Sequence, residues 1–320
     1  MRLMVNHEGE GCPDAPAGPW IIKDAPGTCA RRPSFRPISL AYHPDHPAPT
    51  DQPLIEAAQA ALAASTDRVV TLEHAGQQLV IKRVAVRPRS RLQSFFVRWL
   101  VKWITGQALP MATLRLSEAA SSVDFEAQRL TSLAHAGVRV PRLIHCGPGY
   151  LVMAHCGATL GDQIGRWPLD TCRRELQAEA RELGLFHRAG QWHGAAQIKN
   201  LTRQDGHTWR IDFEETFGDL VPLPVAQALD IVLFLNSVSL VAPFNEVESR
   251  QLLPQLLDTC LAENPDPRVR QTLVRALPWV TGVAWLTAPL RGRTVKGRER
   301  KGAARLAILA DAMSSCLRPR

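Results

Sequence analysis

The spacing of apolar and polar positions predicts a first part of the chain that contains strands. An alanine-rich stretch over 53–64, with a proline near its start, predicts a short helix. Two β-prone runs follow over Val69–His74 and 79–84, and the four residues between them predict a hairpin turn. Lys82 lies in the second run, where a lysine taken by itself is more often a solvated edge residue.

Helical spacing returns over 117–137, where Phe125 lies on the apolar face and Gly137 provides a stop signal. Glu126, near the middle of this helix, would by default be a surface acid. A strand entry then leads to a buried strand over 150–153.

A second hairpin is predicted at Asp205-Gly206, because this dipeptide lies between short apolar runs. Folding there brings Asn200 and Asp212 together from the two sides of the turn. An amide oxygen and a carboxylate suit Mg²⁺, a hard cation that completes its shell with substrate phosphates. The alternative is a polar hairpin with ordinary cap residues.

The remainder of the chain is predicted to be mostly helical from Pro168 onward. Apolar positions at helical spacing recur over 177–187, 252–261 and 273–286, and the nearly continuous apolar run over 229–241 predicts a buried helix. Strands followed mainly by helices predict the α+β fold class.

One stretch over 89–105 has a different character. Its apolar face contains two phenylalanines and two tryptophans, and its other face contains Arg91, Arg98 and Lys102. A basic amphipathic helix with tryptophans on the apolar face is typical of a segment that lies in a membrane interface. The alternative is a helix that packs on the core and exposes a basic face.

Composition favours acidic partners. The 320 residues have a formal net charge of +8, and a dense basic tract over 291–305 could bind lipid phosphates or remain a solvated tail. No aromatic residues interleave this tract, so an anionic membrane surface is favoured over any specific nucleic acid.

The first 52 residues are rich in proline and lack periodicity, which predicts a largely disordered arm. The seven cysteines are scattered and form no paired motif, which indicates reduced thiols. The sequence does not begin with an apolar signal segment, so a cytoplasmic location is expected. The sequence contains no continuous run of about 18 apolar residues, so no membrane-spanning segment is expected. The sequence leaves the oligomeric state open.

The order of these pieces resembles the protein-kinase-like superfamily, and in particular the bacterial lipopolysaccharide-core (Kdo/heptose) kinases. LVIK and FEAQRL are the motifs that resemble the superfamily, and AGVRVPRLI, LFHRAGQWHG and D-F-E are those that resemble the lipopolysaccharide-core kinases. The resemblance covers roughly residues 68 to 241. The resemblance implies a two-lobed fold, with a Pro-rich arm over 1–52, a small N-lobe over 53–153 and a helical C-lobe over 154–320.

The resemblance also implies an ATP site and roles for individual residues. Lys82 and Glu126 match the strand lysine and helix glutamate that hold nucleotide phosphates, and Asn200 and Asp212 match the ligands of Mg²⁺. His193 matches the first position of the catalytic loop, and Asp230 matches a buried aspartate of the following large helix.

Two departures put catalysis in question. Ala195 occupies the position of the catalytic aspartate in HGAAQIKN, and no G-x-G-x-x-G motif precedes Lys82. Phosphoryl transfer depends mainly on positioning and charge neutralisation, so activity can survive with a loss of roughly 10²–10⁴-fold. Glu214, Glu215 or His193 could replace the missing acid.

Three functions therefore remain open. The chain could be an ATP-dependent kinase of a lipid-linked sugar, or of a similar phosphorylated glycolipid, peripheral at the inner membrane. It could be a pseudokinase that binds nucleotide or a partner without transfer, as Ala195 suggests. It could also phosphorylate a protein or a small molecule.

Overall fold

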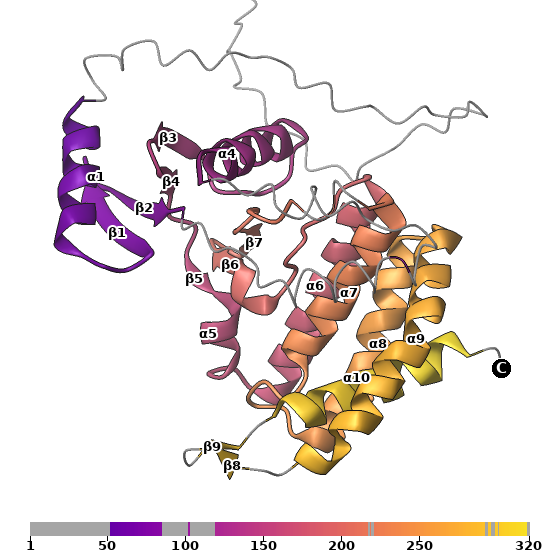
Figure 1. Ribbon diagram of the computed structural model, residues 1–320. Helices are drawn as coiled ribbons and strands as arrows, with labels where there is room; N and C mark the ends of the chain where they lie inside the picture. Colours follow the sequence, from indigo (N-terminus) through magenta and orange to yellow (C-terminus); the bar gives the residue numbers. More distant parts are fainter. Residues whose placement is uncertain are drawn as a thin grey trace, which may run out of the picture. The chain divides into compact units, whose positions relative to one another are not determined.

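The computed structural model describes residues 52–84, 102, 119–216, 218, 221–291, 294–295, 298–299 and 301–318. These residues form a small antiparallel sheet region and a mostly helical remainder, which confirms the α+β class (Figure 1). The predicted N-terminal arm, apart from Gln52, and the predicted amphipathic helix over 89–105, apart from Lys102, lie outside the described residues.

The first sheet has four antiparallel strands in the order β1-β2-β4-β3. The elements that build this region are α1 (Gln52–Ala64), β1 (Val69–His74), β2 (Gln77–Arg83), α4 (Ala119–His135), β3 (Leu143–Gly147) and β4 (Tyr150–Ala154). Helix α1 covers part of the sheet through Leu54 and Ala58, which pack against Ile81 and Val152. The helices predicted over 53–64 and 117–137, the first hairpin and the buried strand are confirmed.

The turn between β1 and β2 is tighter than the sequence predicted. Ala75 and Gly76 have φ values of 49° and 75°, and Gln77 already pairs with His74. Two consecutive residues with positive φ give a turn whose twist matches that of the flanking strands. Strand β2 therefore begins two residues earlier than predicted and lies between β1 and β4, so Lys82 is on an inner strand.

The second sheet contains the hairpin predicted at Asp205-Gly206. Its elements are β5 (Ala158–Thr159), β6 (Leu201–Gln204) and β7 (His207–Arg210), and the short helix α5 (Leu160–Ile164) follows β5. Leu201 pairs with Arg210 across the hairpin, and both turn residues have positive φ. The residues that precede β6 and follow β7 are thereby brought side by side.

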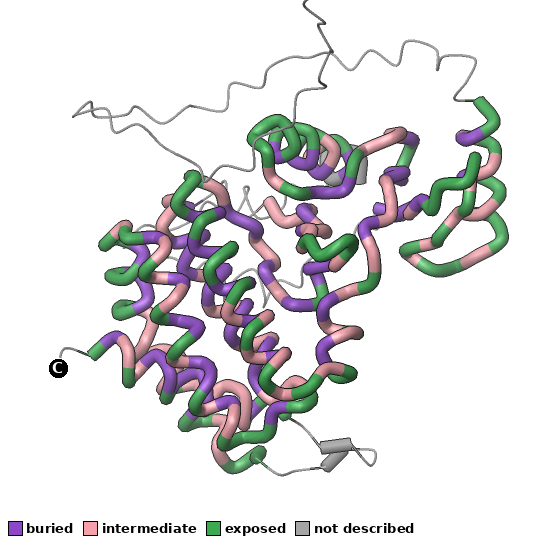
Figure 2. The backbone as a smooth tube through the Cα atoms, turned by 180° about the vertical axis from the view of Figure 1, so that it is seen from behind, coloured by how far each residue is buried: buried purple, intermediate pink, exposed green. Residues whose placement is uncertain are grey.

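The helical part confirms the prediction for the region after Pro168. It consists of α6 (Leu169–Arg188), η1 (Ile198–Asn200), α7 (Leu223–Val238), α8 (Glu246–Glu263), α9 (Pro267–Thr287), η3 (Ala288–Leu290) and α10 (Gly302–Leu317). Leu176, Ile231 and Leu256 are fully buried between these helices, and Figure 2 shows the buried positions along their facing sides. Helix α7 ends at Val238 instead of 241, because Leu240 has a φ of 55°.

The basic tract over 291–305 does not end as a solvated tail. Two short strands, β8 (Thr294–Val295) and β9 (Arg298–Glu299), pair within it, and its last residues belong to α10. Ala303 is buried there, and α10 packs against α9 and α8. The end of the tract is thus attached directly to the helical core.

Candidate functional site

A buried ion pair between Lys82 and Glu126 forms the centre of the site. Lys82 Nζ lies 2.8 Å from Oε1 and 2.9 Å from Oε2 of Glu126. Lys82 on β2 is 5% exposed and Glu126 on α4 is 1% exposed. Their default interpretations as surface residues are wrong, whereas the structure brings them together as the resemblance implies.

Two further carboxylates reach the same ammonium from the segment that follows β7. Asp212 Oδ1 accepts a hydrogen bond from Lys82 Nζ, and Glu214 Oε2 lies 3.3 Å from it. Glu214 also accepts a hydrogen bond from Arg68, which precedes β1. The side chains of Asp212 and Glu214 are each 26% exposed, so solvent reaches the ion-pair network from their side.

The charges of this network determine its protonation. Burial by itself lowers the pKa of Lys82, but the carboxylates of Glu126, Asp212 and Glu214 together outweigh burial and raise it. For the acid Asp212, burial by itself raises the pKa, but the Lys82 ammonium holds this pKa below its usual value. Lys82 is therefore cationic and Asp212 anionic at neutral pH.

Glu126 experiences opposing influences. Burial and, less strongly, the carboxylates of Asp212 and Glu214 raise its pKa, the Lys82 ammonium lowers it, and the net effect is a raised pKa. Both oxygens of Glu126 are nevertheless bonded to Lys82 Nζ. A protonated carboxyl group would present a donor to a donor there, so we assign Glu126 as ionised.

The loop that contains His193 is held by Asp230 of α7. Asp230 is fully buried, and its two oxygens accept hydrogen bonds from the backbone N–H of His193 at 2.6 Å and of Gly194 at 2.8 Å. The ring of His187 lies 3.2 Å from the same carboxylate. This arrangement matches the position that the resemblance assigned to Asp230, and it fixes the start of the loop against the core.

The side chain of His193 is buried. Its ring stacks on Phe213 at a centroid distance of 4.3 Å, and burial lowers its pKa to about 4. The N–H of Ala195 donates to Nδ1, and Nε2 is buried without a hydrogen-bond partner among the described residues. This environment favours a structural role for His193 over its predicted role as a proton acceptor.

Asn200 and Asp212 lie at the open end of the β6–β7 hairpin, as the sequence predicted. The N–H of Ile211 donates to the carbonyl oxygen of Asn200 at 3.0 Å, which places Asp212 one residue away. The Asn200 amide nitrogen donates to the Ala195 carbonyl at 2.8 Å. The side-chain atom of Asn200 that remains suited to a cation is therefore its oxygen.

These residues could together hold a magnesium ion that is shared with a ligand. They offer an ionised carboxylate and an amide oxygen, both of which are hard donors. The described part of the chain contains no group of three or more His, Cys, Asp or Glu side chains that could hold a metal ion. A cation at this site would thus need oxygens from bound phosphate or water to complete its shell.

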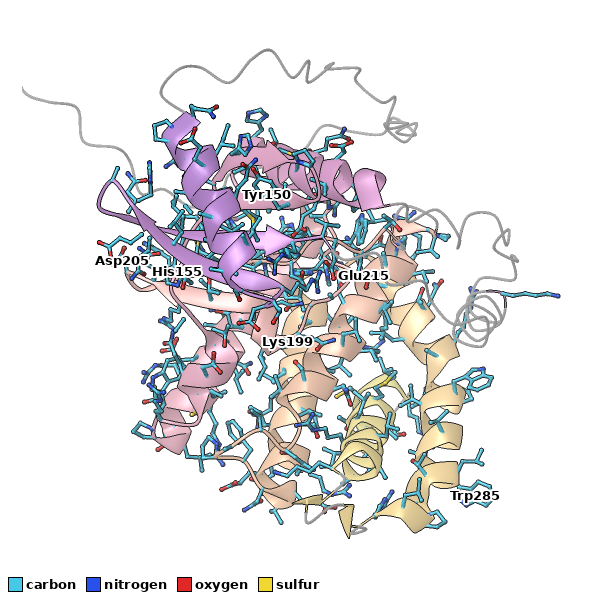
Figure 3. All side chains as sticks on the ribbon, turned by 60° about the vertical axis from the view of Figure 1, so that its left-hand side comes forward. Tyr150, His155, Lys199, Asp205, Glu215 and Trp285 are labelled. Carbon is cyan, nitrogen blue, oxygen red and sulfur yellow. The ribbon has the colours of Figure 1, made fainter. Side chains whose placement is uncertain are left out.

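Glu215 lies beside the loop that contains Ala195. A Cβ built on Gly194 would be 2.8 Å from the Cβ of Glu215, so the two backbones approach closely next to Ala195. Figure 3 labels Glu215 after β7 and the exposed Lys199 on η1 of the same loop. Glu214 pairs with Lys82 and Arg68, whereas Glu215 is the acid whose Cβ lies beside Gly194.

Arg68 is the one residue of the network that sequence reasoning did not select. It is 146 positions from its partner Glu214 and belongs to no motif. Only the approach of the β1–β2 hairpin to the segment after β7 joins them.

No protein-family model and no curated protein matches this chain.

Proposed function

We propose that this protein has a protein-kinase-like two-lobed fold, binds Mg·ATP, and transfers the terminal phosphoryl group to a lipid-linked sugar or similar acceptor at the cytoplasmic face of a membrane. The observation that supports this proposal best is the buried contact of Lys82 with both Glu126 and Asp212. A buried charged network is costly to maintain and is weak evidence of stability by itself. Perturbed, buried ionisable groups that border solvent are typical of functional sites.

Each part of the network has a role in this proposal. The Lys82 ammonium, oriented by Glu126, neutralises phosphate oxygens of the nucleotide. Asn200 and Asp212 would hold Mg²⁺, which would neutralise part of the phosphate charge. Asp230 positions the loop that presents Asn200 by binding the backbone of His193.

The proton of the acceptor hydroxyl requires another group, because Ala195 cannot accept it. We assign this role to Glu215, whose backbone lies against Gly194. Positioning and charge neutralisation supply most of the rate enhancement in phosphoryl transfer, so a substitute acid supports slow turnover. An acceptor associated with an anionic membrane surface suits the net charge of +8.

A second candidate function is a pseudokinase that binds nucleotide or a partner without transfer. Ala195 supports it directly, since the usual catalytic acid is absent. The contact of Asp212 with Lys82 also supports it, because this contact stabilises the network without any ligand. A protein or small molecule as acceptor would leave the same nucleotide site unchanged.

The nucleotide site is tested by thermal shift with ATP in Mg²⁺ and in EDTA. We expect Mg·ATP to raise the melting temperature of wild-type protein, and Asp212→Asn to abolish the increase. Asp205→Asn, at the exposed tip of the same hairpin (Figure 3), is the matched control and should retain it. No increase in wild-type protein would reject both nucleotide-binding functions.

Catalysis is tested by ATP consumption and by label transfer from γ-labelled ATP, with and without cell-envelope lipid. A kinase should transfer label to lipid, and Glu215→Gln should reduce the turnover about 10²-fold or more without weakening Mg·ATP binding. Turnover that survives both Glu214→Gln and Glu215→Gln would exclude these acids. Nucleotide binding without transfer to any acceptor would favour the pseudokinase.

A further inference from the structure

The end of α9 is unusually apolar for a surface that no other described element covers. Trp285 is 78% exposed and Leu286 is 71% exposed, and Leu290 follows with 39%. Figure 3 shows Trp285 pointing away from the helices. Exposed apolar residues are ordinary when they are scattered singly, but adjoining ones mark interaction surfaces.

Basic residues flank this apolar end of α9 on both sides in the sequence. Arg268, Arg270 and Arg275 belong to the first half of α9, whereas residues 276 to 290 contain no charged side chain. The segment directly after them contains seven basic residues and one acid: Arg291, Arg293, Lys296, Arg298, Arg300, Lys301, Arg305 and Glu299. An apolar segment with tryptophan, bounded by arginine and lysine, has the composition of a membrane-interface anchor.

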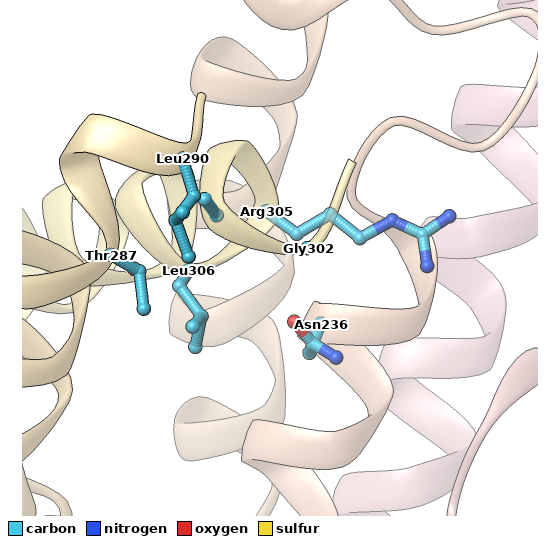
Figure 4. A pocket seen from close by; sticks show the side chains of 7 residues that line it. Asn236, Thr287, Leu290, Gly302, Arg305 and Leu306 are labelled. Carbon is cyan, nitrogen blue, oxygen red and sulfur yellow. The ribbon is translucent and has the colours of Figure 1, made fainter. Parts of the chain in front are cut away.

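A hollow beside the apolar end is lined in part by polar side chains that can bind a phosphate. It has a volume of about 540 Å³ and opens between α7, η3 and α10. Leu290 and Leu306 line one side, and Asn236 and Arg305 line the other (Figure 4). The Nε of Arg305 is buried without a hydrogen-bond partner among the described residues. A guanidinium and an amide next to apolar side chains suit a phosphate that is attached to a lipid.

We propose that this surface, formed by Trp285, Leu286 and Leu290 together with Arg291, Lys301 and Arg305, docks the protein on an anionic phospholipid membrane. Trp285 and Leu286 enter the headgroup region, while Arg291, Lys301 and Arg305 remain at the level of the lipid phosphates. This surface is distinct from the ion-pair network at Lys82 and does not depend on nucleotide binding. It would orient the protein on the bilayer whether or not the protein transfers phosphate.

Other occupants fit these observations less well. The stretch Pro267–Leu290 is long and apolar enough to cross a membrane by length and composition alone, and only 17% of its most apolar window is buried. However, Leu273 is fully buried, and α9 packs on α10 and α7, so a spanning position would expose their core. A second copy of the chain would bring two basic segments together, which is electrostatically unfavourable.

The test uses the full-length protein and co-sedimentation with vesicles of phosphatidylcholine, either alone or mixed with phosphatidylglycerol. We expect binding to the anionic vesicles that weakens with salt. The double variant Trp285→Ser/Leu286→Ser should reduce the vesicle affinity at least about tenfold. Val247→Ser is the matched control, because Val247 is 63% exposed at the start of α8, and it should bind as wild type does.

The electrostatic part is tested by Arg291→Glu against Arg166→Glu, since both arginines are exposed. Only the first should weaken binding, by a few-fold. Brominated lipids should quench tryptophan emission in wild-type protein more than in the double variant. No anionic vesicle binding, equal binding by the double variant, or a wild-type dimer that the double variant dissociates without any lipid binding would each overturn the proposal.

Discussion

The carboxylate of Asp230 accepts a hydrogen bond from the backbone N–H of His193 at 2.6 Å, and both residues lie out of contact with solvent. The second oxygen of Asp230 binds the N–H of Gly194 in the same way. Burial alone would raise the pKa of Asp230, but its hydrogen bond with His187 and the groups around it hold this pKa below its usual value. A single charge on α7 therefore fixes the loop on which Asn200 depends.

Asp230→Asn should destabilise the protein by about 3 kcal/mol, because an amide presents a donor where two backbone donors already point. Urea unfolding measures this loss. Asp205→Asn changes an exposed aspartate on a turn and should stay within about 0.5 kcal/mol of wild type. Equal stability of the two variants would show that the loop does not need the buried charge.

Removal of the lysine from the central ion pair should also be costly. Lys82→Met leaves Glu126 buried without its partner and should lower the free energy of unfolding by about 3–5 kcal/mol. The double variant Lys82→Met/Glu126→Leu should recover most of that stability, because the fully buried Glu126 carboxylate is removed with its partner and Asp212 borders solvent. Nucleotide binding should be lost in both variants, which separates the stability of the pair from its role. A double variant as unstable as Lys82→Met would contradict this account.

The stability of the protein should fall as the pH decreases from about 6.5 toward 4. The pKa of His193 is lowered to about 4 in the folded protein by burial, whereas an unfolded histidine titrates near 6.5. In this window the unfolded chain binds the proton and the folded chain does not, so acid favours unfolding. His193 alone contributes a slope of about 1.4 kcal/mol per pH unit.

His187 adds to that slope, because burial lowers its pKa too. The matched comparison is therefore His193→Phe, which keeps a ring against Phe213 and removes one titrating group. Urea unfolding at a series of pH values should give a slope smaller by about one proton in the variant. The lowered pKa values of Asp212 and Asp230 act at lower pH than this window.

Gly194 should tolerate no side chain. Its φ is 88°, and an added Cβ would lie 2.8 Å from atoms of both Glu215 and Trp192. Gly206 has a similar φ of 76° with no atom within 4 Å of an added Cβ. Gly206→Ala should cost about 1 kcal/mol from backbone strain alone. Gly194→Ala should cost more than that in thermal or urea unfolding and should also weaken Mg·ATP binding.

The local elements could largely be predicted from the sequence because short-range signals specify them. Asp205-Gly206 marks a hairpin, and the apolar spacing of α6 marks a helix, whatever the rest of the chain does. Lys82 and Glu126 are different, since nothing near either residue indicates burial. Their environment is created by the pairing of β2 with β4 and by the packing of α4, which are contacts between distant segments.

The same limit applies to Arg68 and Trp285. Arg68 acquires its role only when the strand it precedes lies near the segment after β7. Trp285 belongs to a helix that is predicted from apolar spacing. This pattern does not show which side of the helix packs on α10 and which side is left uncovered by the described residues. The end of α7 also depended on a backbone reversal at Leu240 that no strong turn residue signals.

The network around Lys82 contains two cationic side chains, Lys82 and Arg68, and three carboxylates, those of Glu126, Asp212 and Glu214. Its formal charge is therefore one unit negative before any ligand arrives. A free nucleoside triphosphate would be repelled by this excess, and a bound divalent cation would reduce the repulsion by neutralising part of the phosphate charge next to Asp212. Occupancy of the site around Lys82 would then require the cation together with the nucleotide.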